Sequence, residues 1–152
     1  MILLSAFKQA VLLIKAFEGC RLKAYQDRGG VWTIGWGETL GVQSGMLWSQ
    51  GLADEVLEKR VWQFLLGVLQ RCPQLWSESE EKLAACTSLA YNIGLGAFAR
   101  SSVCRLTKKK EFTRAAESFL LWNKSAGAVD RILVLRRAKE RRIFSTNAAR
   151  HF

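Results

Sequence analysis

The distribution of glycine constrains the fold of this chain more than any other feature of its sequence. Eight of the twelve glycines fall between Gly19 and Gly51. They separate short runs rich in Trp, Val, Thr and Ile, such as residues 31–34, and this pattern is typical of a small meander of short strands joined by tight turns. Outside that segment apolar residues recur with helical spacing, so the sequence predicts one small sheet in a chain of helices.

The predicted helices cover residues 5–17, 49–70, 77–92, 101–107, 111–122 and 130–144. Gly19 ends the first helix, and Ser49 is the candidate N-cap of the second. The third begins with a capping box, Ser77–Glu80. The second helix, of about 20 residues, has a predicted length of about 30 Å, which is enough to connect two lobes.

This order of elements predicts a single α+β domain over residues 1–152. A small N-terminal lobe holds the sheet, at about residues 19–50. A larger helical lobe contains about residues 70–152 together with the first helix, and the long helix joins the two lobes.

Composition restricts the partners and the compartment. With 23 Lys and Arg against 13 Asp and Glu, the net charge is +10, which attracts polyanions such as nucleic acid, anionic membranes or cell-wall polymers. No segment is long and apolar enough for a spanning helix, and the apolar N-terminus lacks the basic region and cleavage site of a signal peptide. We therefore expect the chain to be made and kept in the cytoplasm.

The compartment bears on the state of the cysteines. Four of them, Cys20, Cys72, Cys86 and Cys104, are widely spaced and form no C-x-x-C pair. A zinc site is not expected, because the only histidine, His151, lies at the end of the chain. We expect four free thiols, in keeping with a reducing cytosol, and no metal or other cofactor.

Glu18 is the first candidate catalytic residue. It continues the apolar face of the first helix, four residues after Ile14 and seven after Val11, so its carboxyl is predicted to leave water. The negative end of the helix dipole also favours the protonated form of this carboxyl. A general acid needs that form. The alternative is a surface glutamate at a frayed helix end.

Asp27 and Thr33 are the next candidates. Asp27 heads the turn Asp27–Gly30, where its side chain is expected to accept backbone hydrogen bonds, and Thr33 is a β-branched residue of a strand. Each has an ordinary structural explanation by itself. A hairpin after the first helix can nevertheless bring Asp27 and Thr33 over Glu18. Two carboxyl groups of unequal pKa on either side of a cleft are what glycoside hydrolysis requires.

Residues 17–37 resemble the catalytic segment of the phage-type lysozymes, the endolysins of glycoside hydrolase family 24. The family places eight residues between its Glu and Asp and five between its Asp and Thr, and Glu18, Asp27 and Thr33 have this spacing. Residues 89–101 resemble the central helix of the family and the turn after it. Residues 119–124 and 135–140 resemble its C-terminal part, so the resemblance covers nearly the whole chain.

The resemblance implies a lysozyme-like fold and a peptidoglycan hydrolase that cleaves the β-1,4 bond between N-acetylmuramic acid and N-acetylglucosamine. It implies that Glu18 is the general acid, that Asp27 holds or activates water on the opposite face of the sugar, and that Thr33 helps to position that water. It also implies release from the host cytoplasm when a holin-type membrane protein opens the inner membrane, followed by lysis of the host. We expect a monomer that binds no nucleic acid.

Three further residues match positions that line the sugar cleft in relatives: Thr39, Tyr91 and Ser101. A core or helix-cap role is nearly as good an explanation for each of them. All three are therefore candidates for substrate binding.

Two features depart from the family pattern. Many relatives have Gly-x-Gly-His-Thr where this chain has Gly35–Thr39, with Glu38 at the histidine position. Glu38 either holds a structural hydrogen bond or shifts the pH optimum. Of a run of three basic residues in the family, this chain keeps two, Arg136 and Arg137. We expect both to lie on a solvated helix face, and the alternative is that one of them contacts Glu18.

Two other classes of function stay open. The segment from Arg131 to Phe152 carries seven Arg and Lys against Glu140 alone, as in a nucleic-acid-binding module, although no recognised nucleic-acid motif accompanies it. The second class is a catalytically silent relative that binds the cell wall, which the departure from the family pattern at Glu38 would indicate.

Overall fold

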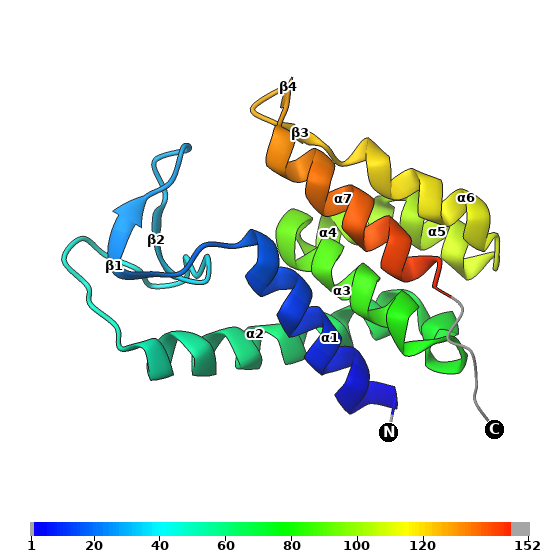
Figure 1. Ribbon diagram of the computed structural model, residues 1–152, viewed down its shortest axis with the longest axis horizontal. Helices are drawn as coiled ribbons and strands as arrows, with labels where there is room; N and C mark the ends of the chain where they lie inside the picture. Colours follow the sequence, from blue (N-terminus) through cyan, green and yellow to red (C-terminus); the bar gives the residue numbers. More distant parts are fainter. Residues whose placement is uncertain (1, 147–152) are drawn as a thin grey trace.

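The computed structural model describes residues 2–146, and in this part of the chain two lobes are joined by one long helix (Figure 1). The helices are α1 (Ile2–Phe17), α2 (Gln50–Arg71), α3 (Glu80–Ile93), α4 (Leu95–Arg100), α5 (Ser102–Lys108), α6 (Phe112–Ser118) and α7 (Arg131–Phe144), with short 3₁₀ helices at Pro73–Ser77 and Phe119–Leu121. The strands are β1 (Arg21–Gln26), β2 (Trp32–Gly35), β3 (Lys124–Ser125) and β4 (Ala128–Val129). The predicted α+β class is confirmed.

The small lobe is built on the antiparallel hairpin of β1 and β2, in which Tyr25 pairs with Thr33. This lobe has a minor core of its own, made by Ala24, Ile34 and Val42, with Trp32, Met46 and Trp48 packed against it. The expected meander contains only these two strands. Between β2 and α2 the chain turns repeatedly at glycines with positive φ, which leaves room for isolated bridges but no third strand.

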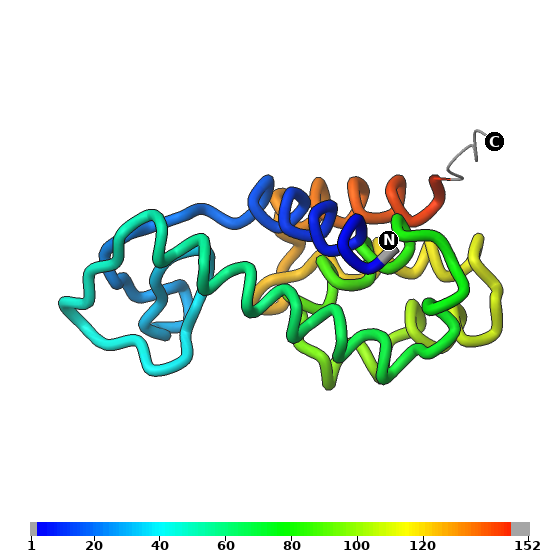
Figure 2. Tube along the Cα trace, turned by 90° about the horizontal axis from the view of Figure 1, so that it is seen from below, coloured from blue at the N-terminus to red at the C-terminus, as the bar shows by residue number. Residues whose placement is uncertain are grey.

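Helix α2 connects the two lobes, as the sequence predicts, and runs along the length of the molecule (Figure 2). Ser49 caps it, because the Oγ atom accepts a hydrogen bond of 3.1 Å from the backbone N–H of Leu52. Buried side chains recur along one face of the helix, at Leu57, Val61, Leu65 and Val68. The cap and the apolar stripe together explain a helix of 22 residues.

Helix α3 is the centre of the large lobe. All nine residues from Lys82 to Ala90 are buried, because α1, α2 and α7 pack around this helix. The packing brings the C-terminal end of α1 beside α7, at the boundary between the lobes (Figure 1). Among the described helices, none combines the length and the apolar character needed to cross a membrane.

Several boundaries differ from the prediction. Helix α3 begins after Ser79 and not at Ser77, because Oγ of Ser79 accepts the cap hydrogen bond from Lys82, at 3.3 Å, while Pro73 starts a 3₁₀ helix that ends at Ser77. The predicted helix over 111–122 changes from α6 to a 3₁₀ helix after Ser118. Helix α4 and the β3–β4 hairpin were not predicted, since elements of six and two residues are too short to show a period.

Candidate active site

A cleft of about 250 Å³ lies between the lobes, with Glu18 in its wall. The other lining residues come from α1, the β1–β2 hairpin, α3 and the segment from β3 to α7: Phe17, Arg28, Asn92, Ser125, Asp130, Ile132, Leu133 and Arg136. The backbone N–H of Glu18 donates to the carbonyl oxygen of Ile14 at 2.8 Å. The last turn of α1 therefore fixes where this acid stands in the cleft.

The carboxyl group of Glu18 is bound by Arg136 and lies close to the backbone of Gly37. Nη1 of Arg136 donates to Oε1 at 2.8 Å. On the other side the backbone of Gly37 comes so close that a Cβ atom there would lie 3.3 Å from Oε2 of Glu18. The side chain of Glu18 remains 26 % exposed, so the predicted withdrawal from water is partial and the carboxyl stays accessible from the cleft.

The prediction of a solvated helix face for Arg136 and Arg137 is wrong. Their side chains are 2 % and 0 % exposed, and Arg136 makes the contact with Glu18 that was the alternative. Nη1 of Arg137 donates to Oδ1 of Asn92 at 2.9 Å, and both arginines face Glu140, which is fully buried. Sequence reasoning missed Glu140, although its spacing of i+3 and i+4 from the two arginines was an available signal.

Asp27 and Thr33 lie on the β1–β2 hairpin, as expected. The Oδ1 atom of Asp27 accepts hydrogen bonds from the backbone N–H groups of Gly29 and Val31, both at 2.9 Å, so the predicted turn is confirmed and both bonds fall on one oxygen. Thr33 is buried, and its hydroxyl donates to the carbonyl oxygen of Val31 at 2.9 Å.

The tip of this hairpin reaches the large lobe across the cleft. Nη1 of Arg28, the residue after Asp27, lies 3.5 Å from Oδ2 of Asp130. Asp130 is also the N-cap of α7, since its Oδ1 accepts a hydrogen bond from the N–H of Leu133. Asp27 therefore stands beside a residue that lines the same cleft as Glu18.

A second pocket, of about 200 Å³, brings together Thr39 and Tyr91, two of the predicted substrate-binding residues. Gly37 also lines it, and since Gly37 packs on Glu18, the two pockets adjoin. The hydroxyl of Tyr91 donates to the carbonyl oxygen of Trp36 at 2.9 Å. Burial raises the pKa of Tyr91, and the carboxylates of Glu18 and Glu38 raise it further.

Ser101 is not among the residues that line these two pockets. It is the N-cap of α5 and is buried, at 3 % exposure. Its Oγ donates to the carbonyl oxygen of Phe98 at 2.7 Å and accepts from the N–H of Cys104 at 3.1 Å. The structure thus gives Ser101 the cap role that the sequence left open.

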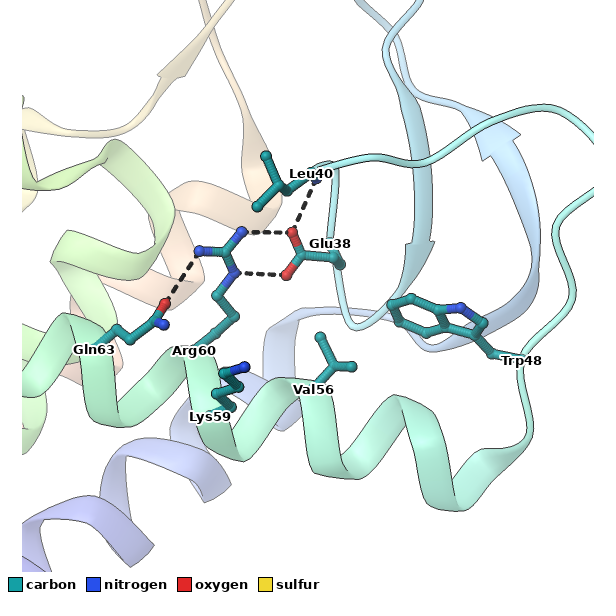
Figure 3. Close-up of a pocket in the computed structure, with 7 residues that line it drawn as sticks. All are labelled: Glu38, Leu40, Trp48, Val56, Lys59, Arg60 and Gln63. Atoms are coloured by element: carbon teal, nitrogen blue, oxygen red, sulfur yellow. Dashed lines mark hydrogen bonds and ion pairs between the residues drawn. The ribbon is translucent and has the colours of Figure 1, made fainter.

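Glu38 forms a bidentate ion pair with Arg60 of α2 (Figure 3). Nε and Nη2 of Arg60 lie 2.7 and 2.8 Å from Oε2 and Oε1 of Glu38, and the N–H of Leu40 donates to Oε1 at 2.9 Å. These hydrogen bonds, above all those from Arg60, lower the pKa of Glu38. Of the two roles that the sequence left open for Glu38, the structure supports the structural one.

The four cysteines are free thiols, with Cys20 partly exposed and Cys72, Cys86 and Cys104 buried. Within residues 2–146 no group of three or more Cys, His, Asp and Glu side chains is placed to hold a metal ion. His151, and Arg150 of the basic segment, lie outside the described residues.

Known proteins share this sequence and this fold. Residues 15–140 match the sequence profile of the phage lysozyme family. An endolysin of Salmonella phage P22 is 39% identical over 138 residues, which are 86% of this chain and 91% of that protein. An endolysin of Bacillus phage B103 is 37% identical over 142 residues, which are 91% of this chain but only 53% of that protein, so this chain spans about half its length.

A solved structure agrees. The muramidase domain of SpmX from Asticaccaulis excentricus superposes with a TM-score of 0.82 at 31% identity, covering 91% of this chain and 95% of that domain. The predicted lysozyme-like fold is therefore confirmed. The matched segment contains Glu18, Asp27 and Thr33, and it ends at the buried Glu140. The chain belongs to the phage lysozyme family.

Proposed function

We propose that this chain is an endolysin that hydrolyses peptidoglycan at the β-1,4 bond between N-acetylmuramic acid and N-acetylglucosamine. The observation that carries the proposal is the placement of Glu18 in a cleft lined by both lobes, with its carboxyl accessible and hydrogen-bonded to Arg136. A glycan strand needs such an open groove, and its hydrolysis needs an acid at the scissile oxygen.

Asp27 and Thr33 have separate proposed roles in the reaction. Glu18 donates a proton to the leaving-group oxygen while Asp27 holds a water on the opposite face of the sugar. Oδ2 of Asp27 is the oxygen for that water, since both backbone hydrogen bonds fall on Oδ1. The hydroxyl proton of Thr33 is donated to Val31, so the oxygen of Thr33 accepts a hydrogen bond from the same water.

Thr39 and Tyr91 are the substrate-binding residues that we propose for the adjoining pocket. Glu38 stands in the same pocket, but Arg60 balances its charge. Glu38 therefore gives no reason to expect a catalytically silent protein. Burial of Arg136 and Arg137 removes two cations from the surface that a nucleic acid would contact, which favours the hydrolase over a nucleic-acid-binding module.

We also propose the biological setting that the resemblance implies. The chain acts as a monomer, without bound nucleic acid, and reaches the wall after a holin-type protein permeabilises the inner membrane. Expression without such a partner is expected to leave the producing cells intact, and lysis of those cells would contradict this release route.

A turbidity assay on chloroform-treated Gram-negative cells tests the catalytic proposal. The wild-type chain is expected to clear the suspension, and Glu18→Gln is expected to abolish clearing while the melting temperature changes by only about a few degrees. Glu58→Gln is the matched control, because Glu58 is an exposed residue of α2. Substantial clearing by Glu18→Gln would contradict the assignment of Glu18.

A further inference from the structure

Four charged groups form a continuous chain from the cleft into the core. Glu18 pairs with Nη1 of Arg136 at 2.8 Å, and Nε of Arg136 lies 3.6 Å from Oε2 of Glu140. Oε1 of Glu140 lies 2.6 Å from Nε of Arg137, and Nη2 of Arg137 donates to Oε2 at 3.2 Å. With both carboxyls ionised, the two negative and two positive charges balance.

Burial of this charge chain is costly, and packing alone does not explain it. Arg137 and Glu140 are fully buried, and buried ion pairs are often no more stable than apolar side chains of the same volume. Burial raises the pKa of Glu140 and lowers that of Arg137, although each group opposes the shift of the other. A helix face that packs on α3 would normally be apolar, so these charges call for another explanation.

The chemistry of Glu18 supplies that explanation. A general acid has to be held in place without facing an unbalanced positive charge, and Nη1 of Arg136 lies 2.8 Å from Oε1 of Glu18. Glu140 acts on the far side of the same guanidinium. Its negative charge offsets part of the positive field of Arg136 and Arg137 at Glu18.

The surroundings of Glu18 include few other charges. Tyr91 on α3 interacts electrostatically with Glu18 and is uncharged over the working pH range, since its pKa is raised. Arg28 lines the cleft from the β1–β2 hairpin but pairs with Asp130. Glu38, in the adjoining pocket, pairs with Arg60, so Arg136 of α7 is the charged group in direct contact with the carboxyl of Glu18.

We propose that Glu140, together with Arg137, is a positioning residue of the active site that fixes Arg136 against Glu18 and limits the positive charge that the acid experiences. This inference rests on the proposed role of Glu18. It makes the position and the electrostatic surroundings of an accessible acid depend on a carboxylate that is fully buried.

The pH dependence of kcat/KM at constant ionic strength tests the proposal. Glu140→Gln leaves the arginine charges unbalanced. The basic limb of the pH profile is therefore expected to move to lower pH. The expected shift is about one pH unit, the size for a unit charge at about 10 Å with an effective dielectric constant of about 20. Arg137→Gln removes a positive charge and is expected to shift the basic limb in the opposite direction.

Glu117→Gln is the control for charge alone, because Glu117 pairs with Arg141 of α7 at an exposed site. Its profile is expected to coincide with that of the wild type. Should Glu140→Gln fail to fold, the upward shift in Arg137→Gln decides the question. Unshifted limbs, an equal loss of activity at every pH, or failure of both variants to fold would overturn the positioning role. An active Glu18→Gln variant would instead overturn the proposed role of Glu18 as the general acid, on which this inference rests.

Discussion

The ion pair between Glu38 and Arg60 joins the small lobe to the connecting helix, and Arg60→Gln is expected to destabilise the fold measurably. The pair consists of two charge-assisted hydrogen bonds, at 2.7 and 2.8 Å. Hydrogen bonds to charged groups contribute about 1.5–3 kcal/mol each when they are well buried. The side chains of Glu38 and Arg60 are 10% and 29% exposed, so water replaces part of what is lost.

We therefore expect Arg60→Gln to lower the free energy of unfolding by about 2 kcal/mol at neutral pH. For a chain of this length the melting temperature should fall by about 4–8 °C. Arg114→Gln is the control: Arg114 pairs with Glu111 at an exposed site, and its loss should cost less than about 0.5 kcal/mol. Urea denaturation of the three proteins measures their free energies of unfolding, and thermal denaturation measures their melting temperatures.

Acid provides the second half of this test. The folded state lowers the pKa of Glu38, so the pair contributes its full stability above the ordinary glutamate pKa of about 4.3 and loses it as the pH falls through the folded value. The difference between wild type and Arg60→Gln should therefore shrink below that pH. Equal stabilities at neutral pH, or a difference that persists unchanged in acid, would show that the ion pair between Glu38 and Arg60 does not stabilise the fold.

Three further substitutions or measurements follow from the same geometry. Gly37→Ala and Gly41→Ala both place a side chain at positive φ, at a cost in stability of about 1 kcal/mol. Only Gly37→Ala adds an atom 3.3 Å from the Glu18 carboxyl, so only that variant should lose lytic activity. Equal activities of the two variants would contradict the contact between Gly37 and Glu18. Ser101→Ala should lower stability by about 1–2 kcal/mol and leave KM unchanged, whereas a raised KM with normal stability would favour sugar binding. Thiol titration of the native protein should detect Cys20 alone, and four thiols after unfolding without reductant; two or fewer would show that cysteines pair.

Local patterns in the sequence predicted the parts of the fold that depend on neighbouring residues. The cap at Ser49, the apolar stripe of α2 and the Asp27 turn each arise from residues a few positions apart. The spacing of Glu18, Asp27 and Thr33 likewise lies within one short segment, of which Glu18 and Arg28 line the cleft.

Contacts between distant segments were not predictable in the same way. Arg136 reaches Glu18 across 118 positions in the sequence, and the charged composition of α7 suggests a solvated helix unless its partners are known. The apolar residues of α7 crowd into its first turns, where Ile132 and Leu135 are more than half exposed. Hydrophobic periodicity therefore indicated no buried face for this helix, and the face that packs on α3 is the charged one.

The proposed reaction is hydrolysis of the β-1,4 bond between N-acetylmuramic acid and N-acetylglucosamine, with Glu18 as the acid. Mass spectrometry of purified peptidoglycan digested with the chain and then reduced with borohydride tests it most directly. Every new reducing end is expected to be N-acetylmuramic acid, reduced to its alditol, and Glu18→Gln is expected to generate none. Reducing ends of N-acetylglucosamine, cleavage within the peptide stems, or the same products from Glu18→Gln would contradict it.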